Sequence, residues 1–496
     1  MGELFIGVDA GSSVLKAAAF DLSGRAVAVA SRRTPLSRRE GRVEADPDRA
    51  REALVAVLRE VVEEAGGTGR IAGLGIAGAM VGAWVVDAAG RTLRPGINWE
   101  DSRAQDLIAG LMSDRPRLLS EIFAISGSVM QQGCTLPVIA ALLREEPQVM
   151  ARAHAVLGYK DWLRLCLTGR IATDTGEAAV APGDARRQAR SAELVALFGL
   201  TEHAHLFPDA LPSAAVAGHV TAEAAAKTGL PEGLPVVAGA GDVIANVIGA
   251  GGLRPGAITG LLGTTCMVGL CTDRPVFEPP DLGLLFSLPE RHWFRAMVNV
   301  AGTLNLDWAA GLMFPDLAGR DDLFAQVEAA ARAQPVGSGS VVYLPYLSES
   351  GIIAPVASVA ARAQFAGLTP VHNRAAMIRA VYEGVAFSIA DLCDLLAPPQ
   401  DAPIVLTGGG GRSVFWCDMI AEATGRVVVV PEGQEFGARG AALLAATGLG
   451  RFGSVVEASA SVAGGGRRHL PSGRDAAAWQ AARARYRDMR DRALGL

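Results

Sequence analysis

Short apolar runs separated by small and polar residues open the chain and predict a β-meander. Residues 4–8, 17–21 and 26–30 are the three runs, and Gly, Ser and Asp are prominent between them. Such runs, bounded by turn-forming residues, are typical of strands joined by tight turns. The first turn, residues 9–13, consists of small residues and one acid.

An amphipathic helix is predicted next. Asp46 is a favourable N-cap and Pro47 suits the first helical position. Apolar residues then recur at helical spacing until Gly66 and Gly67 end the pattern. The further elements predicted in this half are strands at 71–77, 84–87 and 235–237, a loop at 78–82, a mostly helical segment at 105–229 and a helix at 243–249.

The opening pattern returns in the middle of the chain. Residues 256–262 are largely apolar, residues 263–265 form a Gly-Thr-Thr turn, and residues 267–271 are apolar again. A repeated order of strand, Gly/Ser/Thr turn and strand indicates an internal duplication. We therefore expect two related domains, residues 1–248 and residues 249–496.

Strands and helices alternate in the second half, which predicts an α/β fold. The predicted elements are a helix at 374–396, a strand at 404–407, a glycine turn at 408–411, a helix at 413–424, a strand at 427–430, and helices at 435–447 and 475–494.

The composition fits a chain that buries two large cores. The chain has 496 residues, 50% of them hydrophobic, and a net charge of −5. The absence of a basic stripe argues against a nucleic-acid binder. Neither a signal peptide nor a run of about 18–20 apolar residues is evident, and the six cysteines show no metal-ligand spacing. We expect a cytoplasmic protein with reduced thiols and no membrane partner.

The first turn carries groups that suit a phosphate or a metal ion. Gly11 lets the backbone approach a phosphate, the hydroxyls of Ser12 and Ser13 donate to its oxygens, and Asp9 suits a hydrated cation. Lys16 follows three residues after Ser13. An Asp-x-Gly turn is also a common device in hairpins, so the local pattern leaves both interpretations open.

The second turn has similar donors but no acid. Taken alone, Gly263, Thr264 and Thr265 favour a simple β-turn. The pair of turns changes this interpretation, because two Gly/hydroxyl hairpins facing each other would clamp phosphates from both sides.

Asp242 lies between the two turns in sequence, at a strand end, where a carboxylate suits a general base. The structural alternative is that Asp242 is the N-cap of the next helix.

Two more segments carry candidate chemistry. The glycines at 408–411 and Ser413 lie between a predicted strand and a helix, where backbone amides suit an anion or a nucleotide; a plain turn is the alternative. Residues 99–103, Trp-Glu-Asp-Ser-Arg, combine an aromatic face with acids that accept bonds from hydroxyl groups. A salt-bridged surface turn is the alternative there.

Together these motifs resemble the FGGY carbohydrate kinases, which include xylulokinase, glycerol kinase, ribulokinase and erythritol kinase. The resemblance rests on motifs in one order: residues 7–13, 99–103, 239–242, 262–265 and 408–413, with a further stretch to residue 442. It implies two RNase-H-like domains of the actin/hexokinase type flanking a central cleft, with ATP, Mg²⁺ and a small sugar or polyol bound between them. Because dimers are common in such families, the expected assembly is a homodimer.

The resemblance also implies a role for individual residues. Asp242 is the expected catalytic base, and Asp9 and Asp242 are expected near the Mg²⁺. The residues assigned to nucleotide and phosphate binding are Gly11, Ser12, Ser13, Lys16, Gly263, Thr264, Thr265, Gly409 and Gly410. Those assigned to the sugar pocket are Ala79, Met80, Val81, Trp99, Asp101 and Asp242.

The departures from the family pattern concern the substrate. Xylulokinases usually carry Gln-Met-His where this chain has Ala79, Met80 and Val81, and glycerol kinases usually carry Arg-Glu at the last two of these positions. After the expected base, Val243 stands where the family often has Asn or Gln. Ser12 replaces the usual Thr and keeps the hydroxyl. With fewer polar groups to read hydroxyls, the expected class is a linear pentulose, pentitol or tetritol. The alternatives are an actin-like or chaperone-like switch ATPase and a catalytically weak sugar-binding relative.

Overall fold

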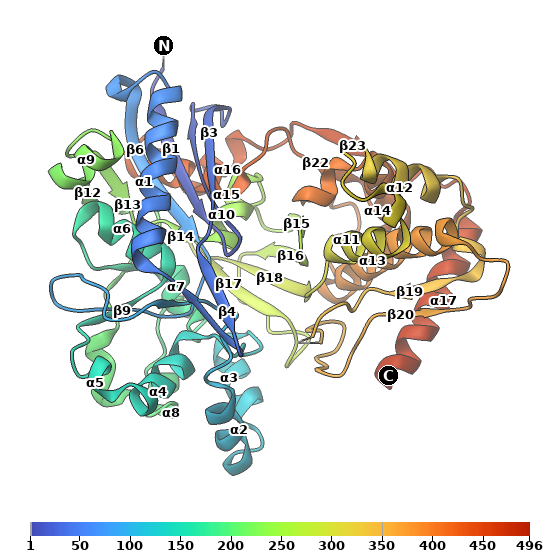
Figure 1. Ribbon diagram of the computed structural model, residues 1–496, viewed down its shortest axis with the longest axis horizontal. Coiled ribbons are helices and arrows are strands. Elements are labelled where there is room, and N and C mark those ends of the chain that lie inside the picture. Colours follow the sequence, from blue (N-terminus) through green and yellow to red (C-terminus); the bar gives the residue numbers. More distant parts are fainter. Residues whose placement is uncertain (1, 350) are drawn as a thin grey trace.

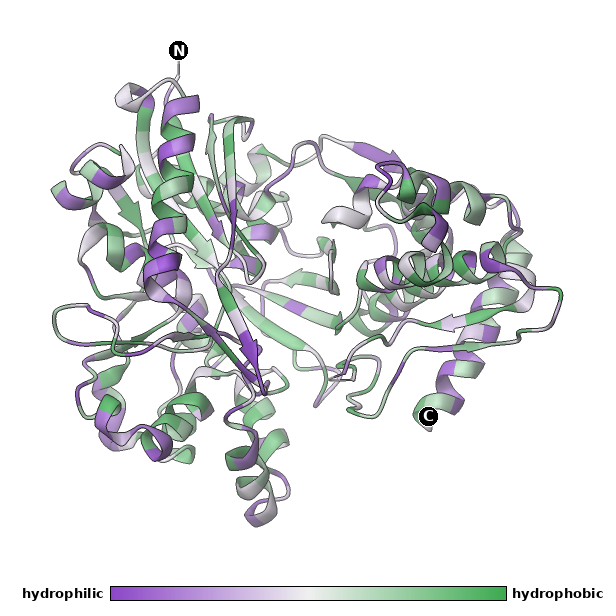
Figure 2. Ribbon diagram, in the orientation of Figure 1, coloured by the Kyte–Doolittle hydropathy of each residue, from purple (hydrophilic) through white to green (hydrophobic). Residues whose placement is uncertain are grey.

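The computed structural model describes residues 2–349 and 351–496. It has two lobes, each built around a seven-stranded sheet (Figure 1). Strands of both sheets are rich in apolar residues, whereas polar residues alternate with apolar ones along the outer helices (Figure 2). This distribution is that of two α/β cores, as the sequence predicts.

The first sheet contains the opening meander. β1 pairs antiparallel with β2 and parallel with β6, and β2 pairs antiparallel with β3. Its strands are β1 (Leu4–Ala10), β2 (Val14–Phe20), β3 (Ala26–Arg33), β6 (Ile71–Gly78), β12 (Val216–His219), β13 (Pro235–Val237) and β14 (Ala240–Gly241). β1 and β6 are almost wholly buried, which explains their continuous apolar character.

The second sheet repeats this plan. β15 pairs antiparallel with β16 and parallel with β21, and β16 pairs antiparallel with β18. Its strands are β15 (Ile258–Leu262), β16 (Cys266–Thr272), β17 (Leu284–Leu288), β18 (His292–Asn299), β21 (Ile404–Thr407), β22 (Val428–Val430) and β23 (Arg467–His469). The predicted duplication is therefore present in the topology. β17 and β18 are strands that the sequence pattern did not predict.

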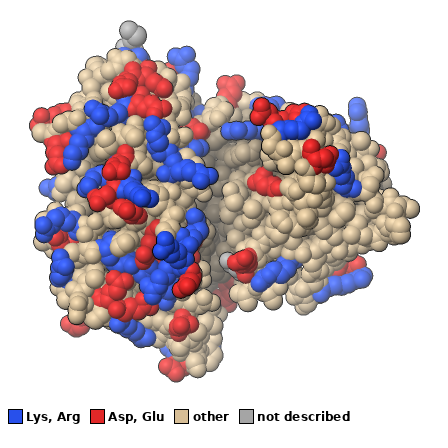
Figure 3. All heavy atoms as spheres, viewed as in Figure 1, with Lys and Arg blue, Asp and Glu red and all other residues tan. Residues whose placement is uncertain are grey.

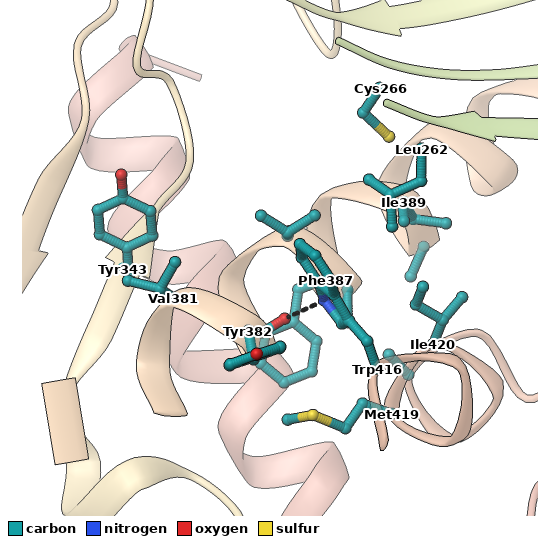
Figure 4. Close-up of a cluster of buried hydrophobic side chains, with 14 of the residues drawn as sticks. Leu262, Cys266, Tyr343, Val381, Tyr382, Phe387, Ile389, Trp416, Met419 and Ile420 are labelled. Carbon is teal, nitrogen blue, oxygen red and sulfur yellow. Dashed lines mark hydrogen bonds between the residues drawn. The ribbon is translucent and has the colours of Figure 1, made fainter. Parts of the chain in front are cut away.

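Helices cover the sheets where the apolar spacing places them. α1 (Pro47–Glu64) begins after Asp46, whose carboxylate accepts from two helix amides. In the second lobe α13 (Arg374–Leu396) packs on α14 (Val414–Thr424), and the indole of Trp416 donates to the carbonyl of Tyr382 at 3.1 Å (Figure 4). Ser413 is the N-cap of α14, at the start of the helix predicted for residues 413–424.

The remaining elements form insertions and edges. Those of the first half are β4 (Leu36–Arg39), β5 (Arg42–Ala45), β7 (Trp84–Val86), β8 (Gly96–Ile97), α2 (Gln105–Asp114), α3 (Leu118–Ser126), α4 (Thr135–Glu145), α5 (Pro147–Met150), β9 (Ala155–Leu157), α6 (Tyr159–Thr168), β10 (Thr173–Asp174), α7 (Thr175–Val180), α8 (Ala192–Leu197), β11 (Ala210–Leu211) and α9 (Ala222–Thr228). Those of the second are α11 (Leu304–Met313), α12 (Leu323–Arg332), β19 (Val342–Leu344), β20 (Gln364–Ala366), α16 (Val455–Ser461) and α17 (Ala476–Leu494). No helix within residues 2–349 and 351–496 is long and apolar enough to cross a membrane.

Two helices join the lobes, α10 (Asp242–Gly249) and α15 (Phe436–Gly448). They pack on each other, and α15 also lies against β1 and β6 of the first sheet. Small residues make this possible: a Cβ on Gly7 would fall 1.7 Å from the carbonyl oxygen of Ala438, and one on Gly440 would fall 1.9 Å from that of Ala245. The second half of the chain thus contributes a helix to the first lobe.

Candidate functional site

A groove separates the two lobes on the face shown in Figure 3. The first predicted phosphate turn closes the β1–β2 hairpin, where the Gly11 amide donates to the Val14 carbonyl at 3.2 Å. The hydroxyl of Thr34 supports the turn by donating to the Gly11 carbonyl at 2.6 Å. Ser12 accepts from the indole nitrogen of Trp99 at 2.8 Å. The predicted phosphate turn and the predicted sugar segment are therefore in contact.

An acidic cluster lies at the end of β1. The amino group of Lys16 lies 2.7 Å from a carboxylate oxygen of Glu435, the residue before α15. A Cβ on Gly437 would fall 2.3 Å from Oδ2 of Asp9, so the start of α15 meets the Asp9 carboxylate. Burial, and the nearby charge of Asp242 after it, raise the pKa of Asp9 to about 7. The close approach of α15 to β1 thus places Glu435 beside both Lys16 and Asp9.

Asp242 begins α10 and is half-buried. The N-cap is Gly241, so the alternative interpretation of Asp242 as the N-cap is wrong. One of its oxygens accepts from the Val243 amide at 2.8 Å. Burial raises the pKa of Asp242 to about 6. A carboxylate with a pKa near neutrality is suited to accept a proton at physiological pH.

The second hairpin turn joins β15 to β16 and lies beside the glycine turn after β21. The carbonyl of Gly263 accepts from the amide of Thr303, and that of Thr264 from the amide of Gly302, each at 2.7 Å. The side chain of Thr264 is exposed. A Cβ on Gly408 would fall 2.5 Å from the Leu262 carbonyl oxygen, so the two turns are in contact. Gly263 and Gly409 by contrast face open space. The predicted phosphate turn and the glycine turn predicted to bind the nucleotide therefore form one surface.

The segment that begins with Trp99 contains a buried ion pair. The guanidinium of Arg103 donates to Asp101 at 2.8 Å, and the Val43 amide donates to the other Asp101 oxygen at 2.7 Å. Neither side chain is exposed. The alternative of a salt-bridged surface turn holds for Glu100, which pairs with the exposed Arg38 at 2.9 Å, but not for the buried Asp101 and Arg103. In this conformation Asp101 is also out of reach of a ligand, in contrast to its predicted place in the sugar pocket.

Three of the other predicted sugar residues line a small hollow with about 10 Å³ of interior space, room for roughly one water molecule. Trp99 and Asp242 are not among its lining residues. Ala79, Met80 and Val81 form one wall, and Trp84, Asn98 and Tyr159 are among the other lining residues. A Cβ on Gly241 would fall 2.1 Å from the sulfur of Met80, so this wall touches the turn before Asp242. Ala79, Met80 and Val81 make this wall mostly apolar.

Sequence reasoning missed three residues of this region. Glu435 directly precedes the motif at 436–442 and pairs with Lys16, 419 positions earlier. Thr34 follows the third strand and supports the Gly11 turn. The hydroxyl of Tyr159 is buried and has no hydrogen-bond partner among the described residues. Only Glu435 carried a usable signal, its position next to a recognised motif.

Comparison with known proteins identifies the family and the fold. Residues 4–249 match the model of the FGGY family of carbohydrate kinases, N-terminal domain, and residues 259–449 match the C-terminal domain. The chain is 31% identical to the erythritol kinase of Brucella abortus (91% of this chain, 88% of the relative). It is 30% identical to the xylulose kinase of Escherichia coli (99% and 100%). The structure of xylulose kinase from Rhodospirillum rubrum superposes with a TM-score of 0.86 at 29% identity (98% of each chain). The two-lobed fold is thus that of the actin/hexokinase type, and the chain belongs to the FGGY family of carbohydrate kinases.

Proposed function

We propose that this carbohydrate kinase transfers the γ-phosphoryl group of ATP to a hydroxyl of a small linear sugar or polyol, with Asp242 as the general base. The observation that carries the proposal is the position of Asp242. It starts the helix that joins the two lobes, next to the apolar hollow through Gly241 and next to the acidic cluster through Asp9. A base between a sugar pocket and a phosphate site fits this reaction.

Asp242 would accept the proton of the attacking hydroxyl. A carboxylate with an ordinary pKa is a weak base, and burial brings its pKa to about 6, closer to the pH at which the enzyme works. The Val243 amide would hold the other part of the carboxylate in place. The hydroxyls and amides of the two hairpin turns would then orient and neutralise the phosphoryl group, which is the main requirement of such transfers.

The acidic cluster fits a magnesium ion. Oδ1 of Asp9 is buried without a hydrogen-bond partner among the described residues, and the repulsion between Asp9 and Asp242 contributes to the raised pKa of Asp9. A divalent cation would remove this repulsion. Within residues 2–349 and 351–496 no three His, Cys, Asp or Glu side chains form a metal cluster. Mg²⁺ binds one or two carboxylates and completes its shell with water and phosphate oxygens, so Asp9 and Asp242 would suffice to hold it.

The apolar wall of the hollow favours a short, linear substrate bound beside it. This wall of Ala79, Met80 and Val81 provides few groups that would pair with hydroxyls. Pentuloses, pentitols and tetritols fit this description, and the relatives named erythritol kinase and xylulose kinase act on substrates of these classes. Trp99, fixed by its bond to Ser12, would place its ring where the sugar and phosphate sites meet.

The test is ADP release measured with pentuloses, pentitols, tetritols, glycerol and hexuloses at saturating MgATP. We expect one pentulose, pentitol or tetritol to stimulate ADP release strongly. Stimulation only by a hexulose or glycerol would contradict the substrate class. Steady ATP hydrolysis that no sugar changes would contradict the proposed function and favour a switch ATPase.

A further inference from the structure

The wall of the hollow contains a strained backbone segment, residues 79–82. Val81 has φ of 58° and Gly82 has φ of 75°. Glycine adopts this left-handed conformation freely, but a β-branched residue does so rarely and at a cost in energy. Such conformations persist where the surroundings enforce them, and they cluster at ligand-binding sites. The contacts that hold Val81 therefore bear on ligand binding.

Three amides of the segment are anchored. The first and the last donate to the backbone carbonyls of Ala10 and Gly133, each at 3.0 Å. The amide of Val81 instead donates to a side chain, Oε1 of Glu177 on α7, at 2.7 Å. Glu177 is 6% exposed and 96 positions away in sequence. One buried carboxyl group thus holds the residue with the strained backbone.

The position of this segment matters for the base. The Met80 side chain lies directly on Gly241, the residue before Asp242. A shift of Val81 would move its neighbour Met80, and with it the wall that faces a bound sugar beside the base.

We propose that Glu177 is a positioning residue for sugar binding, which holds Val81 in the left-handed conformation and thereby fixes the Met80 wall beside Asp242. Glu177 acts through the segment and not on the reacting atoms. The inference rests on the proposed function, since it takes the Met80 wall to border the sugar site beside Asp242.

The chemistry of Glu177 suggests a conservative variant. Burial raises the pKa of Glu177 to about 8, with Lys160 opposing the shift and Asp161 and Asp174 adding to it. The group is then largely uncharged at pH 7. Glutamine has the same shape and keeps the carbonyl oxygen that accepts from the Val81 amide. Glu177→Gln should therefore preserve the anchor, while Glu177→Ala removes it.

A second buried glutamate provides the matched control. Glu383 accepts from the Gly337 amide at 2.9 Å and the Ser338 hydroxyl at 2.8 Å, and pairs with Arg379 at 2.7 Å. It also holds a left-handed segment, residues 337–340, but in the other lobe and away from the hollow. Glu383→Gln should lower the melting temperature without changing the KM for the sugar.

The experiment measures KM for sugar and for ATP in these variants, alone and combined with Val81→Gly. We expect Glu177→Ala to raise the sugar KM about tenfold or more and the ATP KM less than about twofold, whereas Glu177→Gln stays within about threefold of wild type. Because glycine needs no help to adopt the left-handed conformation, the effect of Glu177→Ala should fall below about threefold in the Val81→Gly background. Equal effects in both backgrounds, or equal changes of both KM values, would overturn the proposal.

Hydrogen exchange of the peptide that contains residues 79–82 separates this proposal from the proposed function. We expect exchange about tenfold faster or more in Glu177→Ala than in wild type, and unchanged exchange in Glu177→Gln and Glu383→Gln. This holds even if no sugar stimulates ATP turnover. Unchanged exchange in Glu177→Ala would overturn the positioning role. If Glu177→Ala does not fold, Glu177→Met takes its place in both measurements, because methionine keeps the volume of the side chain but has no oxygen to accept from the Val81 amide.

Discussion

The two Gly/hydroxyl hairpins share one backbone plan but differ in charge. The β1–β2 turn lies beside Asp9, Lys16 and Glu435, whose ionisable groups come from three segments. The β15–β16 turn carries only hydroxyls and amides, and it borders the open surface at Gly409. Under the proposed function, this difference predicts a division of work in which the first lobe would manage the cation and the proton while the second would hold the nucleotide.

The largest effect is expected at the base on the charged side. Asp242→Asn keeps the size of the side chain but cannot accept the substrate proton at neutral pH. We expect kcat to fall about 10³-fold, within the range typical of general bases, while the affinity for ATP changes less than about twofold. Steady-state ADP release measures kcat, and nucleotide titration measures the affinity for ATP. A kcat close to wild type would show that another group acts as the base.

A smaller effect is expected on the uncharged side. Thr264→Ala removes an exposed hydroxyl of the second turn, and a hydrogen bond to a charged phosphate is worth about 1.5–3 kcal/mol. The KM for ATP should therefore rise about tenfold or more, with the sugar KM unchanged. Thr264→Ser keeps the hydroxyl and serves as the control. An effect on the sugar KM alone would contradict the division between the lobes.

The acid of the first hairpin should also affect stability. The pKa of Asp9 is about 7 in the folded protein and near its ordinary value of about 3.9 in the unfolded chain. The folded state thus binds the Asp9 proton more tightly than the unfolded chain does. The stability that comes from this protonated carboxyl group is fully present below about pH 4 and is lost as the pH rises through about 7. Without Mg²⁺, Asp9→Asn should melt several degrees above wild type at pH 8 and close to it at pH 4.5, since about 1 kcal/mol shifts the melting temperature by roughly 2–4 °C. A difference that grows toward acid would contradict this assignment.

The smallest effect is expected at two adjacent glycines. Gly409 has room for a Cβ, so Gly409→Ala should leave the melting temperature unchanged and raise the KM for ATP about threefold by crowding the adenosine. Gly408 has φ of 91° and touches Leu262, so Gly408→Ala should instead lower the melting temperature. Thermal melts and ATP kinetics distinguish them. An unchanged KM in Gly409→Ala would place the adenosine elsewhere.

The sequence predicts most of the fold because its signals are local. Helix α1 has its N-cap at Asp46, and the two hairpins repeat one pattern of apolar runs and small-residue turns. The strands β17 and β18 escaped prediction, since they are buried on both faces and lack an alternating pattern.

The candidate site is predicted less completely, because parts of it depend on contacts between distant segments. Glu435 reaches Lys16 only because α15 returns to the first sheet. The burial of Asp101 with Arg103 depends on the Val43 amide, 58 positions away from Asp101. Spacing along the chain cannot reveal such partners.

The most direct test of the central claim follows the label from γ-³²P-ATP with the stimulating sugar present, in wild type and Asp242→Asn. The account predicts that wild type transfers the label to a sugar phosphate, and that Asp242→Asn binds ATP but transfers almost none. Label released only as inorganic phosphate, or transfer by Asp242→Asn at the wild-type rate, would contradict it.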